Sequence, residues 1–284
     1  MITQKTVAKE IGTLGLLTYQ ISRETFGRQT DQILRAAYEE QYQVVISMAA
    51  HRPLDDQTMQ IKQLLSQGVG GLLINTWGDA EESERIVNTV RGQVPVVTFH
   101  SPTQNLSGVV LDETSGYYEA TEHLIRLGHE RIGFIGTDWD TNHIGSAKAK
   151  GYFLAMHKYG LTPKRIPDKT DFLEPAYQLG KRLGDQFTAL VCRNDYTAIG
   201  LCRGLWEVGI RVPEDVAVVG SGDIEVASYV PSALTTLAIP YEAIAKAAME
   251  LMLEQFGGGQ EPRQITLKPS LVVRESCGAN ISKK

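Results

Sequence analysis

The sequence repeats one pattern along most of its length: an apolar run, a polar stretch, an amphipathic segment of helical period and often a closing glycine. In the first part the apolar runs are GLLTY (15–19), QVVISMA (43–49), GLLIN (71–75) and VPVVTF (94–99). Nearly continuous apolar runs indicate strands that are buried on both faces, and strands that alternate with helices make parallel pairs. This part of the chain therefore predicts a doubly wound parallel sheet.

A second set of the same kind begins at residue 108. Its apolar runs are GVVLD (108–112), RIGFIG (131–136), TALVCR (188–193) and DVAVVG (215–220). Four glycines that follow predicted helices are expected to take the left-handed conformation at the helix ends: Gly68, Gly128, Gly160 and Gly209. After a last predicted helix, the runs QITL and SLVV can each pair with either sheet. The predicted fold class is α/β, with two doubly wound parallel-sheet lobes.

Composition and charge narrow the class of protein. The chain has 284 residues and a net charge of −5, so its surface by itself is poorly suited to coating DNA. Three cysteines without a C-x-x-C motif argue against a disulfide framework and a zinc site, and favour a reducing compartment. No secretion signal and no long apolar run is found, which predicts a cytoplasmic protein that does not enter a membrane.

Motifs of catalysis and cofactor binding are not found. The sequence has no G-x-G-x-x-G after a strand, no phosphate-binding G-x-x-x-x-G-K-[ST] and no G-x-S-x-G. His123 and His129 are six residues apart, which does not match the spacing of a helical metal pair. We therefore expect no catalytic residue, no metal and no cofactor, and we expect that the protein is not an enzyme.

In parallel α/β sheets, ligands bind outside the carboxyl ends of the strands. The residues that follow the predicted strands are therefore the candidates for a binding site: 20–26, 75–78, 100–103, 137–148, 193–195 and 222–224.

Three stretches resemble one family: TEHLIRLGHERIGFIG (121–136), GIRVPEDVAVVGSGDIEVASYVPSALTT (209–236) and PSLVVRESCG (269–278). Together they resemble the effector-binding core of LacI/GalR-type bacterial transcription regulators, and the resemblance runs from about residue 13 to 278. It implies a type I periplasmic-binding-protein-like fold whose two lobes are joined by three crossovers. The lobes would comprise 1–111 plus 241–268, and 112–240 plus 269–284.

The resemblance also implies a function. A small effector (a sugar, sugar acid, sugar phosphate or nucleobase derivative) would bind between the lobes of a homodimeric repressor and change the DNA affinity of a helix-turn-helix headpiece. The stretch VAKEIG (7–12) resembles a headpiece fragment, but no recognition helix follows it. We therefore expect the headpiece to be absent from this chain. Operator DNA would be bound only through that missing headpiece.

Other functions fit the same fold. A solute-binding protein that serves a transporter is the first alternative, and an enzyme built on the same scaffold is another. A core that responds to a protein instead of a small molecule is also open.

Five positions of the first lobe match effector-binding positions of the family. They are Gln20, Phe26, Asn75, His100 and, at the second crossover, Tyr241. For three of them a structural role is the alternative: a core residue at a helix start for Phe26, a turn residue for Asn75 and a structural histidine for His100.

Three positions of the second lobe match as well. Phe172 stands where an aromatic ring stacks on the effector, and Lys148 stands where the family has an arginine in S-x-x-R-x-x-G. Of the neighbours Asn194 and Asp195, we expect Asp195 to cap the next helix and Asn194 to bind the effector.

Two departures from the family bear on the effector. Lys148 replaces the family's arginine, and Gly222 replaces the first aspartate of the G-[FY]-D-D motif. A cation retained without that carboxylate would make the site electropositive, which predicts an acidic or phosphorylated effector, or an unusual polyol.

Overall fold

The computed structural model describes residues 12–19, 21, 24–49, 54–76, 80–136, 147–166, 172–183, 185–259 and 261–279. These residues form two compact units. Unit 1 contains the described residues up to Leu111 together with Tyr241–Leu267, and unit 2 contains Asp112–Pro240 and the chain from Lys268. None of the described helices is long and apolar enough to span a bilayer.

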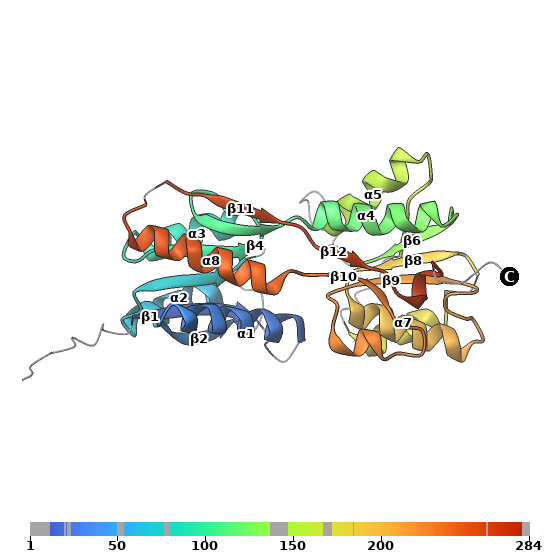
Figure 1. Ribbon diagram of the computed structural model, residues 1–284, viewed down its shortest axis with the longest axis horizontal. Helices are drawn as coiled ribbons and strands as arrows, with labels where there is room; N and C mark the ends of the chain where they lie inside the picture. Colours follow the sequence, from blue (N-terminus) through green and yellow to red (C-terminus); the bar gives the residue numbers. More distant parts are fainter. Residues whose placement is uncertain are drawn as a thin grey trace, which may run out of the picture. The chain divides into compact units, whose positions relative to one another are not determined.

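Unit 1 is a parallel sheet with helices on it. Its elements are β1 (Thr13–Tyr19), α1 (Glu24–Glu39), β2 (Gln43–Ala49), α2 (Leu54–Ser66), β3 (Gly71–Asn75), α3 (Ala80–Val90), β4 (Val96–His100), β5 (Ser107–Leu111), α8 (Tyr241–Phe256) and β11 (Gln264–Leu267). The strand order is β11-β5-β4-β3-β1-β2, and every described pair is parallel. Although they are far apart in the sequence, α1 and α8 pack side by side (Figure 1).

Unit 2 repeats this architecture. Its elements are α4 (Glu113–Arg126), β6 (Ile132–Ile135), α5 (Ala147–Lys158), β7 (Lys164–Ile166), α6 (Leu173–Gly180), β8 (Ala189–Cys192), α7 (Asp195–Glu207), β9 (Ala217–Ser221), η1 (Glu225–Ser228), β10 (Thr235–Ala238), β12 (Ser270–Val272) and η2 (Glu275–Cys277). The strand order is β12-β10-β9-β8-β6-β7, in which β10 and β12 are antiparallel and the other pairs parallel.

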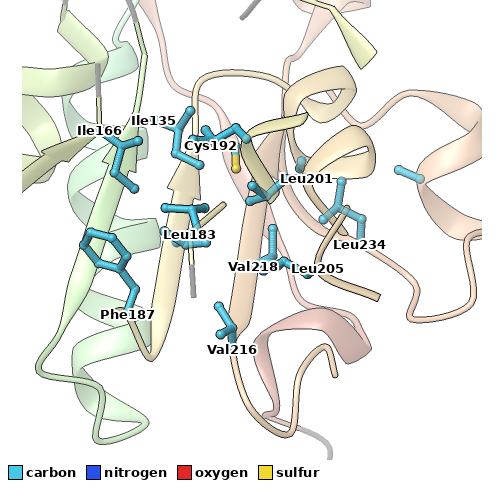
Figure 2. Close-up of a cluster of buried hydrophobic side chains, with 14 of the residues drawn as sticks. Ile135, Ile166, Leu183, Phe187, Cys192, Leu201, Leu205, Val216, Val218 and Leu234 are labelled. Atoms are coloured by element: carbon cyan, nitrogen blue, oxygen red, sulfur yellow. The ribbon is translucent and has the colours of Figure 1, made fainter. Parts of the chain in front are cut away.

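The core of each unit lies between the sheet and its helices. In unit 2, Leu201 and Leu205 of α7 lie near Val218 of β9, and all three are fully buried (Figure 2). Phe187 and Ile166 extend the same cluster toward β7 at the edge of the sheet. Continuous burial on both faces is the reason that the strand sequences read as apolar runs.

The predicted α/β class with two mostly parallel sheets is confirmed. The four glycines predicted to end helices have φ values between 68° and 97°. The sequence did not predict β7, α6, β10 or the two short 3-10 helices η1 and η2. The run QITL forms β11 in the sheet of unit 1, whereas SLV forms β12 in the sheet of unit 2.

Candidate functional site

The carboxyl edge of the unit 1 sheet carries a buried pair of amides. Asn75 is the last residue of β3 and is 2% exposed. Its Nδ2 donates a hydrogen bond to Oε1 of Gln29, on the second turn of α1, over 3.3 Å. Asn75 is thus tied to a helix and is not a free turn residue, and the amide pair places polar atoms where β3 ends.

Two further predicted residues lie at this edge. The ring of Phe26, in the first turn of α1, meets the ring of Tyr19 edge-on, with centroids 6.3 Å apart. Tyr19 ends β1, the strand next to β3. His100 ends β4 with a φ of 91°, a conformation that residues other than glycine rarely adopt. Strained backbone of this kind is common at ligand sites.

The remaining two predicted residues of unit 1 are Gln20 and Tyr241. Gln20 lies outside the described residues. Tyr241 begins α8 and is 7% exposed, and the Arg28 guanidinium lies 5.3 Å from the centre of its ring. Arg28 thus lies against the Tyr241 ring inside unit 1, and the effector contact of Tyr241 stays a prediction.

In unit 2, Lys148 on the first turn of α5 is held by three groups. Its Nζ lies 3.3 Å from Oε1 of Glu113 and donates to the carbonyl oxygen of Arg193 over 3.1 Å. It also lies 5.7 Å from the centre of the Tyr117 ring. Burial raises the pKa of Tyr117 to about 12, although nearby Lys148 lowers it, so the hydroxyl stays a donor, and it donates to the Arg193 carbonyl.

This ion pair corrects one expectation. The site was predicted to carry an uncompensated positive charge, but the Glu113 carboxylate faces Lys148 and neutralises it locally. A second pair joins Arg274 to Asp223 over 2.7 Å, next to Gly222. Lys148 and Arg274 at this edge are therefore each paired with a carboxylate, whereas the preference for an acidic effector stays a prediction.

The expected roles of Asn194 and Asp195 also need correction. Asn194 is the cap of α7, because its side chain accepts a hydrogen bond from the backbone N–H of Thr197 over 2.8 Å. Asp195 is not the cap. It is 1% exposed, and its two oxygens accept from the Thr236 hydroxyl over 2.6 Å and from the Ile224 N–H over 3.0 Å. Asn194 lies two residues after the end of β8, and capping uses its side-chain oxygen.

Asp195 joins the start of α7 to the segment that follows β9. Burial raises the pKa of its carboxyl to about 6, although hydrogen bonds from Thr236 and Ile224 lower it. Asp223 raises this pKa further and Arg274 lowers it. Asp195 thus ties the start of α7 to Ile224 and Thr236 at this edge of the sheet.

Phe172, the last predicted residue, occupies the N-cap position of α6, but its side chain makes no capping hydrogen bond. Its side chain is 56% exposed, an unusual degree for a large apolar ring. The stacking of its ring on an effector stays a prediction.

Three polar residues near the predicted ones were missed. Glu113 could have been noticed, because it follows the strand β5 by two residues and carries a carboxylate. Gln29 and Thr30 of α1 gave no usable signal, because polar residues within a helix are ordinarily solvent-exposed. Both are more than 90% buried here.

The described residues offer little to hold a metal or a cofactor. No group of three or more His, Cys, Asp or Glu side chains among them is arranged to bind a metal ion. All three cysteines are free, and burial raises the pKa of the thiols of Cys192 and Cys202. Thiols of this kind are poor nucleophiles.

Comparison with known proteins identifies the family. Residues 121–277 match the model of the periplasmic binding protein-like domain. The repressor PurR of Haemophilus influenzae Rd is 30% identical to the chain, over 76% of this chain and 67% of its own length. The chain belongs to the LacI family of transcriptional regulators.

Two further relatives agree with this assignment. The ribose operon repressor of H. influenzae Rd is 26% identical, over 94% of this chain and 82% of its own. The fold matches that of a lac repressor dimer bound to operator and an anti-inducer, with a TM-score of 0.86, 22% identity and 95% coverage of both chains. The chain is therefore the ligand-sensing regulatory core of a LacI-family regulator, which is not an enzyme.

Proposed function

We propose that this LacI-family core senses a neutral, hydroxyl-rich small molecule, a sugar or a close derivative. The observation that carries the proposal is the Lys148–Glu113 pair. A paired ammonium and carboxylate present donors and acceptors together without net charge, which suits hydroxyl groups better than an anion. The relative named for the ribose operon also supports a sugar.

On this proposal, the predicted residues at the sheet edge of each unit are the candidates for contacts to the effector. Asn75, His100 and Phe26 would supply those of unit 1, and Lys148, Asn194 and Phe172 those of unit 2. The effector then alters the affinity of a headpiece for operator DNA in the cytoplasm. Coupling of this kind typically changes DNA affinity about 5- to 150-fold.

The first test is a thermal-shift panel of D-ribose, D-glucose, cellobiose, D-ribose 5-phosphate, D-gluconate and hypoxanthine. We expect stabilisation by a neutral sugar, because a ligand at a hundred times its Kd adds about 2.7 kcal/mol to the folded state. A response confined to the phosphate and the gluconate would contradict the proposal. A response to neither class would favour a protein partner instead.

Replacing Lys148 by alanine is expected to weaken binding of that sugar about tenfold or more, since one good hydrogen bond to a charged group is worth about 1.5–3 kcal/mol. Isothermal titration calorimetry measures the change. Lys150→Ala is the matched control, because Lys150 is exposed on the same helix. Equal losses of sugar affinity in the two variants would show that Lys148 acts only through the net charge of the protein.

We propose that the dimer contact lies on unit 2. A groove of about 830 Å³ there is lined mostly by apolar side chains of α6, α7 and residues 230–232. Trp206 at the groove is 66% exposed, with the Arg203 guanidinium 4.3 Å from its ring centre, and Leu173 is 46% exposed. Large exposed apolar surfaces mark interaction sites, and the lac repressor with this fold is a dimer. The proposed partner is a second copy of this chain.

Replacing Trp206 by glutamate is accordingly expected to shift the protein from dimer to monomer, because it removes a large aromatic contact and introduces a charge at the interface. Sedimentation velocity measures the dissociation constant, which should rise at least tenfold. Leu154→Glu is the control, since Leu154 is 48% exposed on α5, outside the groove. An unchanged dimer in Trp206→Glu would place the contact elsewhere.

A further inference from the structure

Helix α1 turns two polar side chains inward. Gln29 is 4% exposed and Thr30 6%, whereas the other buried residues of this helix are Ile33, Ala36 and Ala37. Polar side chains that are this deeply buried normally have hydrogen-bond partners, because burial without one is costly.

Each of these side chains nevertheless keeps one polar atom without a partner in the described protein. Oε1 of Gln29 accepts from Asn75, but its Nε2 donates to no group. The Thr30 hydroxyl is likewise unpaired, although a helical threonine can usually bond to the carbonyl four residues earlier. One buried donor and one buried hydroxyl therefore stand on adjacent residues of α1.

Both residues lie toward the carboxyl edge of the sheet. Gln29 contacts Asn75, where β3 ends. Thr30 follows Phe26 by one helical turn, and Phe26 contacts Tyr19, where β1 ends. Because β1 and β3 are neighbours in the sheet, the two side chains share the edge at which ligands of parallel sheets bind.

We infer that Gln29 and Thr30 form a polar subsite of unit 1 that binds oxygen atoms of the effector. The amide Nε2 donates only, so it requires an acceptor such as a hydroxyl, ring or carbonyl oxygen. The Thr30 hydroxyl both donates and accepts, which suits a hydroxyl group. This inference rests on the proposed function and specifies its chemistry in unit 1: a ligand with at least two oxygen atoms directed toward α1.

The subsite has a signature that separates it from a structural role. An unpaired buried polar atom adds nothing to folding, so its replacement by an apolar atom of similar shape is neutral or stabilising. Thr30→Val should therefore retain or raise the thermal midpoint of the ligand-free protein. Gln29→Met also removes the acceptor of Asn75 Nδ2, so it should lower the midpoint somewhat, and the melting signature is read from Thr30→Val. The same variants should weaken sugar binding about tenfold or more.

The test is calorimetric titration of the parent and variants with D-ribose, D-glucose and cellobiose, together with melting curves without sugar. Gln29→Glu keeps an acceptor for Asn75 but loses the donor, so it should lose binding if Nε2 contacts the sugar. Gln32→Met makes the same chemical change as Gln29→Met at a less buried position of α1 and should leave binding unchanged.

The outcomes are distinct. Parent and variants that bind a sugar equally would overturn the subsite and leave the proposed function standing. A Thr30→Val variant that melts well below the parent without sugar would also overturn it, by showing that the Thr30 hydroxyl stabilises the fold. If none of the three sugars binds the parent, the proposed sugar function fails and the subsite fails with it.

Discussion

Replacing Gly204 by alanine is expected to destabilise unit 2 by about 3 kcal/mol or more, at the upper end of the cost of overpacking a core. Gly204 lies within α7, and a Cβ there would overlap the carbonyl oxygen of Tyr177 in α6. Gly180 and Gly200 meet the facing helix backbone in the same way. Backbone atoms cannot rotate aside as a side chain can, so the helices would have to separate.

The sign of this effect makes it diagnostic. Within an exposed helix, alanine is more favourable than glycine by about 1 kcal/mol, so propensity alone predicts a gain. Urea unfolding followed by circular dichroism measures the difference. Arg203→Ala, at the preceding and exposed position, serves as the control and should cost less than about 1 kcal/mol. A Gly204→Ala variant as stable as the parent would show that α6 and α7 do not pack at backbone contact.

The close packing of α6 and α7 also explains why sequence reasoning missed α6. The segment LEPAYQLG is only eight residues long and contains a proline, and its packing surface includes Gly180. A helix whose contact is made by backbone lacks the apolar stripe that reveals one. The short edge strand β7, Lys164–Ile166, has one buried residue and gives no apolar run. The longer strands could be predicted because they are buried on both faces and therefore read as continuous apolar runs.

At the candidate site, residue types could be predicted from the sequence but partners could not. The sequence indicates that Lys148 is a cation near the strand ends. Its positive charge is balanced by the Glu113 carboxylate, and Glu113 lies 35 positions away in the chain. Asn194 and Asp195 are adjacent, and both residue types are good helix caps. The choice between them depends on Thr236 and Ile224, which only the folded chain brings to Asp195.

Replacing Asp195 by alanine is expected to lower the free energy of unfolding at neutral pH by about 3 kcal/mol or more. The change leaves the Ile224 N–H and the Thr236 hydroxyl without their acceptor in a site that is almost fully buried. It also leaves a cavity beside Gly220, where a Cβ would overlap Oδ1 of Asp195. Urea unfolding of this variant and the parent measures the loss.

The pH dependence of the Asp195→Asn variant tests the carboxyl itself. Its pKa is raised by burial from 3.8 to about 6, so between these values the folded state holds a proton that the unfolded state has released. Folding stability therefore falls as pH rises through this window, by up to about 3 kcal/mol from this group, and stays at the lower level above it. Asparagine does not titrate, so the variant should lack this component.

Asp215→Asn is the matched control, because hydrogen bonds from Arg211 lower the pKa of Asp215 to about 2, and this carboxylate contributes with the opposite sign. Relative to the parent, Asp195→Asn should gain stability as pH rises from about 4 to 6, whereas Asp215→Asn should not. Parallel pH profiles for Asp195→Asn and the parent would mean that Asp195 is ionised throughout. Its bonds to Ile224 and Thr236 would then outweigh burial, and the segment after β9 would be held by a charge at every pH at which the protein folds.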